Sequence, residues 1–174
     1  SMSTRLDLSK LSLMDALDLA KLIELEACHR YQMFANKYGH SSGNDAGAFF
    51  AMMAKNEAKN GQELEERREK LFGDAPAKLT LDDLYDVEAP DMGAPHRGMS
   101  VMDAFKVGLA AEQKAYDFYD SALPGITDSD VRELFTELRD EEVEHVEMLK
   151  EAMAKLPEDA SEDVEYDLDE TPFL

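Results

Sequence analysis

The sequence predicts an all-α protein built as a four-helix bundle. Four long segments repeat apolar residues every three or four positions, which is the spacing of one helical face. No alternating runs of β-branched residues, which would predict strands, compete with this pattern. Short turns join the first two segments and the last two, whereas residues 73–99 separate the pairs. We therefore expect two antiparallel hairpins joined by one long crossover.

Capping residues and helix breakers predict where the four helices begin and end. Ser12 and Ser100 each precede an aspartate by three residues, which is the spacing of a capping box. A glycine or a proline follows each segment and stops the helix there. The helices are expected over about residues 13–38, 46–72, 100–124 and 128–156.

The composition suits a single soluble domain. The chain has 174 residues, of which 44% are hydrophobic and 33% are charged, and this is enough to bury one core. We assign residues 1–156 to the bundle, with the crossover at about 73–99. Residues 157–174 carry eight acidic residues and no basic one, so we interpret them as an acidic C-terminal tail in solvent.

Charge and cysteine content exclude several classes of protein. The net charge is −21, so the chain lacks the basic face that binding to nucleic acid or to an anionic membrane requires. No apolar run approaches the ~20 residues of a membrane span, and no signal-peptide pattern is seen. The single cysteine, Cys28, excludes a disulfide framework and an iron site of four thiolates. A cytoplasmic location is expected.

Each predicted helix carries one glutamate near the middle of its otherwise apolar inward face. These residues are Glu24, Glu57, Glu112 and Glu142. Buried carboxylates need partners of opposite charge, and no lysine or arginine lies on these faces within a turn of them. Two divalent cations would balance the four charges, and small neighbours leave room for them, namely Ala27, Gly61, Gly108 and Ala115. The pattern predicts a dinuclear metal site, unless a different helix rotation exposes the carboxylates.

The two hairpins also repeat one another when they are aligned on their glutamates. The matched pairs are Glu24 with Glu112, Tyr31 with Tyr119, Glu57 with Glu142, and Asn60 with His145. Two like hairpins place equivalent half-sites across a pseudo-two-fold axis. Such symmetry suits two metal ions bridged by carboxylates.

The segments around the glutamates resemble a known family. They read Glu24-Leu-Glu-Ala-Cys-His-Arg-Tyr31, Glu112-Gln-Lys-Ala-Tyr-Asp-Phe-Tyr119 and Glu142-Val-Glu-His145. The first two resemble the single-glutamate helices, and the third the Glu-x-x-His helix, of the rubrerythrin branch of the ferritin-like di-iron carboxylate proteins. The resemblance covers about residues 13–72 and 101–156, and it implies a ferritin-like four-helix bundle.

The resemblance implies a centre of two iron ions, with manganese or zinc as alternatives. Glu57 and Glu142 would bridge or cap the ions. Glu24 and Glu112 would each hold one ion, and His145 would supply a nitrogen ligand. The reaction implied is the reduction of hydrogen peroxide or oxygen, coupled to oxidation of Fe(II), and the expected assembly is a homodimer.

The chain departs from the family pattern at two points. The second Glu-x-x-His position reads Glu57-Ala-Lys-Asn60, so one imidazole is replaced by an amide, which is a weak ligand at best. A single cysteine also cannot build the iron site of a rubredoxin domain, so electrons would come from a separate donor. Tyr31 and Tyr119 would orient carboxylates through hydrogen bonds, or else pack as ordinary core residues.

Other candidate ligands are interpreted as surface or loop residues. Glu26 and His29 also have the Glu-x-x-His spacing, but Glu26 lies about 200° around the helix from Glu24. His40 and His96 fall in predicted loops, and Cys28 is expected to be a packed or interface thiol.

Two other functions stay open at this point. The first is a ferroxidase or iron-sequestering protein, whose acidic surface would concentrate Fe(II). The second is a structural bundle whose metal site has decayed, with Asn60 as its first loss. A large assembly would favour the former, and metal-free protein of undiminished stability the latter.

The substitution Asn60→His tests the interpretation of Asn60 as a lost ligand position. It restores an imidazole at that position, so a rise in the occupancy of the second metal, in a metal analysis of the loaded protein, would support this interpretation. Unchanged occupancy would mean that another residue already fills this role.

Overall fold

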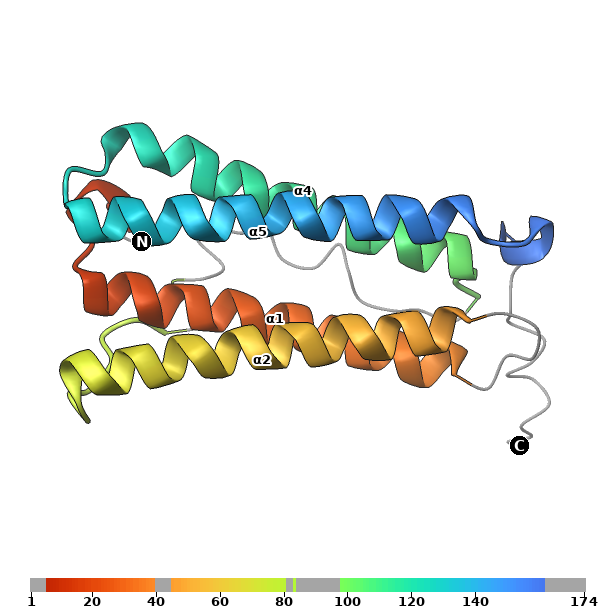
Figure 1. Cartoon of the computed structure of the whole chain (residues 1–174), viewed down its shortest axis with the longest axis horizontal. Coiled ribbons are helices and arrows are strands. Elements are labelled where there is room, and N and C mark those ends of the chain that lie inside the picture. Colours follow the sequence, from red (N-terminus) through yellow and green to blue (C-terminus); the bar gives the residue numbers. More distant parts are fainter. Residues whose placement is uncertain (1–5, 40–44, 81–82, 84–97, 162–174) are drawn as a thin grey trace, which may run out of the picture.

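The computed structural model confirms the all-α bundle and describes residues 6–39, 45–80, 83 and 98–161. Its four long helices are α1 (Leu13–Tyr38), α2 (Ala46–Phe72), α4 (Val101–Ala122) and α5 (Ser129–Ala154). Short 3-10 turns stand at Leu8–Lys10, Leu123–Gly125 and Glu158–Ser161. No strand occurs within the described residues. Figure 1 shows the two antiparallel hairpins, α1 with α2 and α4 with α5, lying along one another.

Local hydrogen bonds explain where the helices begin and end. The Ser12 hydroxyl accepts from the backbone N–H of Asp15 at 3.1 Å, and Ser100 forms a complete capping box with Asp103. These side chains satisfy N–H groups that have no partner inside the helix. Gly73 ends α2 with φ at 61°, a left-handed conformation that favours glycine. The third and fourth helices end two residues earlier than predicted, at Ala122 and Ala154.

Most of the predicted crossover and most of the predicted tail lie outside the described residues. Residues 84–97 of the crossover and residues 162–174 of the acidic tail are in that part of the chain. Within the described part, the tail begins with the 3-10 turn Glu158–Ser161, in which Ala160 is buried. The division at residue 156 stays a prediction.

The hydrophobic core consists of two clusters, one toward each end of the bundle. The first cluster includes Leu11, Leu17, Leu19, Ile23, Leu64, Leu123, Leu134, Phe135 and Leu138. The second cluster includes Phe34, Tyr38, Phe50, Met53, Met99, Phe105 and Leu149. On every helix the boundary between the clusters falls at the position of the inward glutamate. The core is thus interrupted where the carboxylates lie.

One interior position of α2 is held by a charged residue rather than an apolar one. Leu71, which follows the apolar spacing of the inward face, is 51% exposed. Arg68 is buried there instead, and its guanidinium donates to Asp18 at 2.9 Å and to the carbonyl of Gly73 at 3.0 Å. The ion pair and the helix-end carbonyl satisfy the charged group, so the arginine can occupy an interior position.

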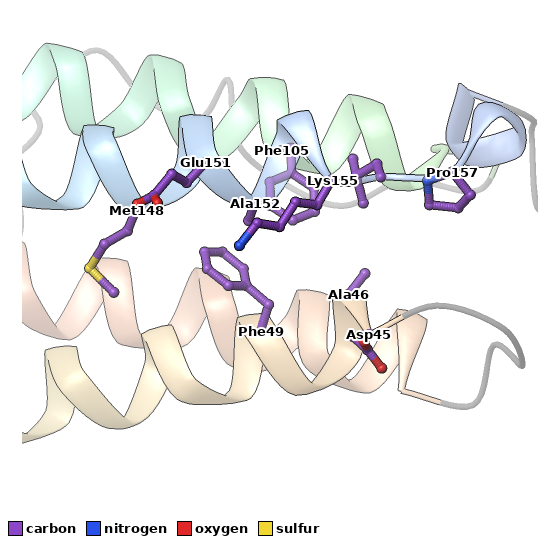
Figure 2. A pocket seen from close by; sticks show the side chains of 10 residues that line it. Asp45, Ala46, Phe49, Phe105, Met148, Glu151, Ala152, Lys155 and Pro157 are labelled. Carbon is purple, nitrogen blue, oxygen red and sulfur yellow. The ribbon is translucent and has the colours of Figure 1, made fainter.

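An apolar cavity lies at the second-cluster end of the bundle. It has a volume of about 530 Å³ and is lined by Phe49, Phe105 and Met148, with Lys155 at its edge (Figure 2). None of the inward glutamates lines it. Among the described residues, no helix is long and apolar enough to cross a membrane.

Two buried glycines on facing helices give a matched test of the packing. A Cβ added at Gly108 would lie 3.3 Å from the Tyr31 ring, whereas one at Gly61 would lie 3.7 Å from the nearest atom. Tyr31 is fully buried, and its ring is packed against Phe50. For Gly108→Ala, an overpacking cost of about 1–3 kcal/mol outweighs the gain in helix propensity of about 0.5–1 kcal/mol.

We therefore expect Gly108→Ala to lower the free energy of unfolding of the metal-free protein and Gly61→Ala to raise it. Urea denaturation of both variants measures the sign of each change in the free energy of unfolding. Stabilisation by both alanines would contradict the tight contact between Gly108 and Tyr31.

Candidate metal centre

The structure brings the four inward glutamates and His145 together between the two core clusters. Each helix contributes one carboxylate, and α5 adds the imidazole. All five side chains are buried, and their residues are exposed by only 1–6%. The helix rotation that would expose the carboxylates is therefore not observed.

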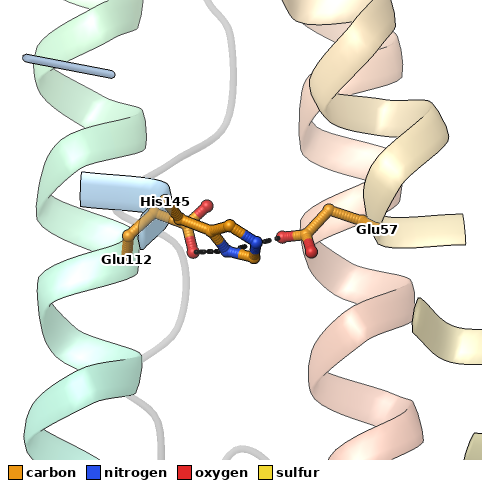
Figure 3. A group of neighbouring side chains, drawn as sticks. All are labelled: Glu57, Glu112 and His145. Carbon is orange, nitrogen blue, oxygen red and sulfur yellow. Dashed lines mark hydrogen bonds and ion pairs between the residues drawn. The ribbon is translucent and has the colours of Figure 1, made fainter. Parts of the chain in front are cut away.

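His145 lies at the meeting point of three carboxylates. Its Nδ1 is 3.3 Å from Glu142 Oε1, 3.4 Å from Glu112 Oε1 and 3.8 Å from Glu57 Oε2. Figure 3 shows the imidazole between Glu112 of α4 and Glu57 of α2. Ligand atoms of Glu57, Glu112 and His145 all lie within 4.8 Å of one another, so these residues could hold one metal ion together.

A buried tyrosine fixes the orientation of Glu112. The Tyr31 hydroxyl donates to Glu112 Oε2 at 2.5 Å, and the Tyr31 ring stacks on Phe50 with an interplanar angle of 13°. Gly108 lies one turn before Glu112 on α4, and its lack of a side chain gives the ring room. The other tyrosine, Tyr119, packs edge-on against Phe135 in the first cluster. Its predicted role in orienting a carboxylate stays a prediction.

Several carboxylate oxygens are buried without a hydrogen-bond partner. Both oxygens of Glu57 and Oε2 of Glu142 are in this state. An unsatisfied buried carboxylate is costly, and no described lysine or arginine pairs with any of the four glutamates. Carboxylate and imidazole ligands suit Fe(II) and Mn(II), so the residues present fit a pair of such ions.

Burial and mutual repulsion disfavour the charged forms of three of the glutamates. Burial raises the pKa of Glu57 well above its ordinary value, and the charges of Glu24 and Glu112 raise it further. Burial, followed by the charge of Glu112, likewise raises the pKa of Glu142. The pKa of Glu24 is raised mainly by burial. Without metal, the centre therefore retains protons that metal ions would displace.

Glu112 and His145 behave as an ion pair within the centre. Burial alone would raise the pKa of Glu112, but hydrogen bonding and charge from His145 lower it below its ordinary value. Burial likewise opposes the charged imidazole, yet contacts with Glu112 and Glu142 raise the pKa of His145 to about 12. The imidazolium of His145 thus supplies one positive charge to the centre, whereas two divalent metal ions would supply four.

Asn60 and a residue that the sequence analysis missed line a cavity beside the centre. This cavity of about 210 Å³ lies between α1, α2 and α5, and its walls include Glu24, Asn60 and Glu141. Burial, then the charges of Glu24 and Glu137, raise the pKa of Glu141 to about 7. The signal in the sequence was its position four residues before His145, which places both on neighbouring turns of α5.

The other candidate ligands lie away from the centre or outside the described residues. Glu26 is half-buried and His29 is exposed on α1. His40 and His96 fall outside the described residues. Cys28 is half-buried, and burial raises the pKa of its thiol, which lowers its nucleophilic reactivity.

Comparisons with known proteins identify a family and a fold. The family model of rubrerythrin matches residues 15–153. The crystal structure of an uncharacterized conserved protein from Magnetospirillum magnetotacticum MS-1 is similar, with a TM-score of 0.70 and 24% identity over 84% of this chain and 97% of that one. At that identity the likeness supports the fold alone. No curated protein matches the chain.

The pKa shifts predict opposite pH dependences of stability without and with metal. Glu57 and Glu142 have raised pKa values in the fold, so their stabilising contribution is complete below about pH 4.5 and is lost as the pH rises. His145 acts in the same direction above about pH 6.5. The free energy of unfolding of the metal-free protein should therefore fall between about pH 5 and 8, by up to ~1.4 kcal/mol per pH unit for each such group.

With saturating Mn(II) the stability should instead rise over this range, because binding requires deprotonated ligands. Denaturant unfolding at several pH values measures both slopes. Glu57→Gln should flatten the slope of the metal-free protein, since it removes one titrating group. A metal-free slope that is zero or positive would contradict the buried, protonated carboxyls.

Proposed function

Because the chain belongs to the rubrerythrin family of di-iron carboxylate proteins, we propose that it is a non-haem di-iron oxidoreductase that reduces hydrogen peroxide or oxygen. The observation that carries this proposal is that both oxygens of Glu57 lie within a buried carboxylate cluster without a hydrogen-bond partner. Bound cations satisfy such oxygens, whereas a bundle with a decayed site would have to keep them at a cost in stability.

The proposed ligands divide into bridging and terminal groups. Glu57 and Glu142, which carry the oxygens without a hydrogen-bond partner, would bridge or cap the two ions. Glu24 and Glu112 would each hold one ion, and His145 would supply nitrogen to one of them. Asn60, with its amide oxygen, is a weak ligand or an outer neighbour.

The bound irons supply the redox chemistry, and the chain positions and protects them. Two Fe(II) ions held here would supply the two electrons that, with two protons, convert one hydrogen peroxide into two water molecules, and they would be left as Fe(III). Tyr31 holds Glu112 in one orientation through its hydroxyl. The two apolar clusters keep bulk water from both sides of the centre along the bundle axis.

The electron donor and the assembly follow from the same proposal. The chain has a single cysteine, so a separate cytoplasmic donor returns the irons to Fe(II). The proposed assembly is a homodimer. Neither nucleic acid nor membrane is a proposed partner, because the net charge of −21 repels both.

Stopped-flow spectroscopy of the anaerobically Fe(II)-loaded protein tests the function. One hydrogen peroxide should oxidise two Fe(II) ions, as followed by the absorbance of Fe(III). Glu57→Ala should slow this reaction by at least about tenfold, because it removes a bridging ligand. Glu69→Ala, an exposed change on the same helix, should leave the rate unchanged.

Oxidation by Glu57→Ala at the rate of the unmodified protein would overturn the site assignment. Rapid oxidation by oxygen together with a mass of many subunits would favour iron storage over peroxide reduction.

A further inference from the structure

The two sides of the centre are unequally provided with ligands. On one side the imidazole of His145 lies against Glu112 and Glu142. On the other side the matching position holds Asn60, which lines the 210 Å³ cavity together with Glu24. The ion next to Glu24 would therefore lack a strong ligand from α2 in addition to Glu57.

Glu141 occupies the α5 wall of this cavity. It is half-buried, directly precedes Glu142, and lies one turn from His145. Among the described residues it forms no hydrogen bond or ion pair, although Arg67 lines the same cavity. The guanidinium of Arg67 is taken by Glu137, at 3.3 Å. A carboxyl side chain thus stands unpaired in a partly enclosed space beside an incomplete half-site.

The other acids of the cavity do not share these properties. Glu137 is neutralised by Arg67, and Glu63 is exposed on α2. Glu24 belongs to the centre itself and is 4% exposed. Glu141 is therefore the carboxylate of this wall that is both unpaired and partly withdrawn from solvent.

We propose that Glu141 supplies a carboxylate oxygen to the metal ion on the Asn60 side of the centre, in place of the absent imidazole. The inference rests on the proposed function, since it assumes that two ions bind. A carboxylate oxygen is a ligand that Fe(II) and Mn(II) accept readily. A fifth carboxylate also suits the oxidised centre. The net charge of two Fe(III) ions with four carboxylates is +2, and a fifth carboxylate lowers it to +1.

Titration of the metal-free protein with Mn(II) tests this ligand without any turnover. Free Mn(II) is measured by its electron paramagnetic resonance signal in solution, and protein-bound pairs by the loss of that signal and the spectrum of coupled ions. The unmodified protein should bind two ions. Glu141→Gln should bind the first ion with an affinity unchanged within about twofold and the second at least about tenfold more weakly.

Two variants separate ligation from a general effect of charge. Glu63→Gln removes the same charge from the same cavity, and Glu144→Gln removes it from an exposed position of α5. Both should retain the second ion within about threefold, because an exposed charge acts only through screened electrostatics. The double variant Glu141→Gln with Asn60→His should recover the second ion, because an imidazole then replaces the lost carboxylate.

The outcomes distinguish a failure of the proposed di-iron function from a failure of Glu141 as a ligand. If the unmodified protein binds no Mn(II) pair, the proposed di-iron function fails. If it binds two ions and Glu141→Gln binds them equally well, Glu141 is not a ligand. An equal loss in Glu63→Gln would likewise overturn the inference, since it would assign the effect to charge. Circular dichroism of each variant verifies that the helices are intact.

Discussion

The structure depends on how four buried carboxylates are compensated. Each helix contributes one of these carboxylates. All four lie between the two apolar clusters, where their charge is poorly solvated. The chain itself offers the imidazole of His145 and the hydroxyl of Tyr31 as partners, and these satisfy mainly Glu112. Both oxygens of Glu57 lack a hydrogen-bond partner. Such an arrangement is stable either with protons retained on the carboxyls or with cations bound between them.

The same constraint explains the residues around the centre. Small side chains are needed where helices approach the carboxylates, and Gly108 leaves the space that the Tyr31 ring fills. The ring in turn is held by Phe50 of the second cluster, so core packing fixes the orientation of a carboxylate. The centre is also asymmetric. One half-site has His145, whereas the other opens through Asn60 into a cavity with an acidic wall. Two ions bound here would differ in affinity and in access to small molecules.

The fold and the principal residues of the centre could be predicted because apolar residues at helical spacing indicate which face of each helix is buried. A glutamate on an apolar face stands out at any of the four positions. Features that depend on the space between helices could not be predicted in this way. Arg68 takes an inward position near the end of α2, because Asp18 of α1 and a helix-end carbonyl are within its reach. Glu141 lies about 100° from Glu142 around α5, outside the apolar face, and its relation to Asn60 emerges only from the cavity between the helices.

The central claim is that two divalent cations balance the buried carboxylates. The most direct test is the number of metal ions per chain, measured by native mass spectrometry after anaerobic loading with Fe(II) and desalting. The account predicts two irons per chain, the second bound more weakly than the first, and their loss in a protein that carries Glu57→Ala. Protein that retains no iron, with stability equal to that of the loaded sample, would contradict it. The carboxylates would then be held by protons alone.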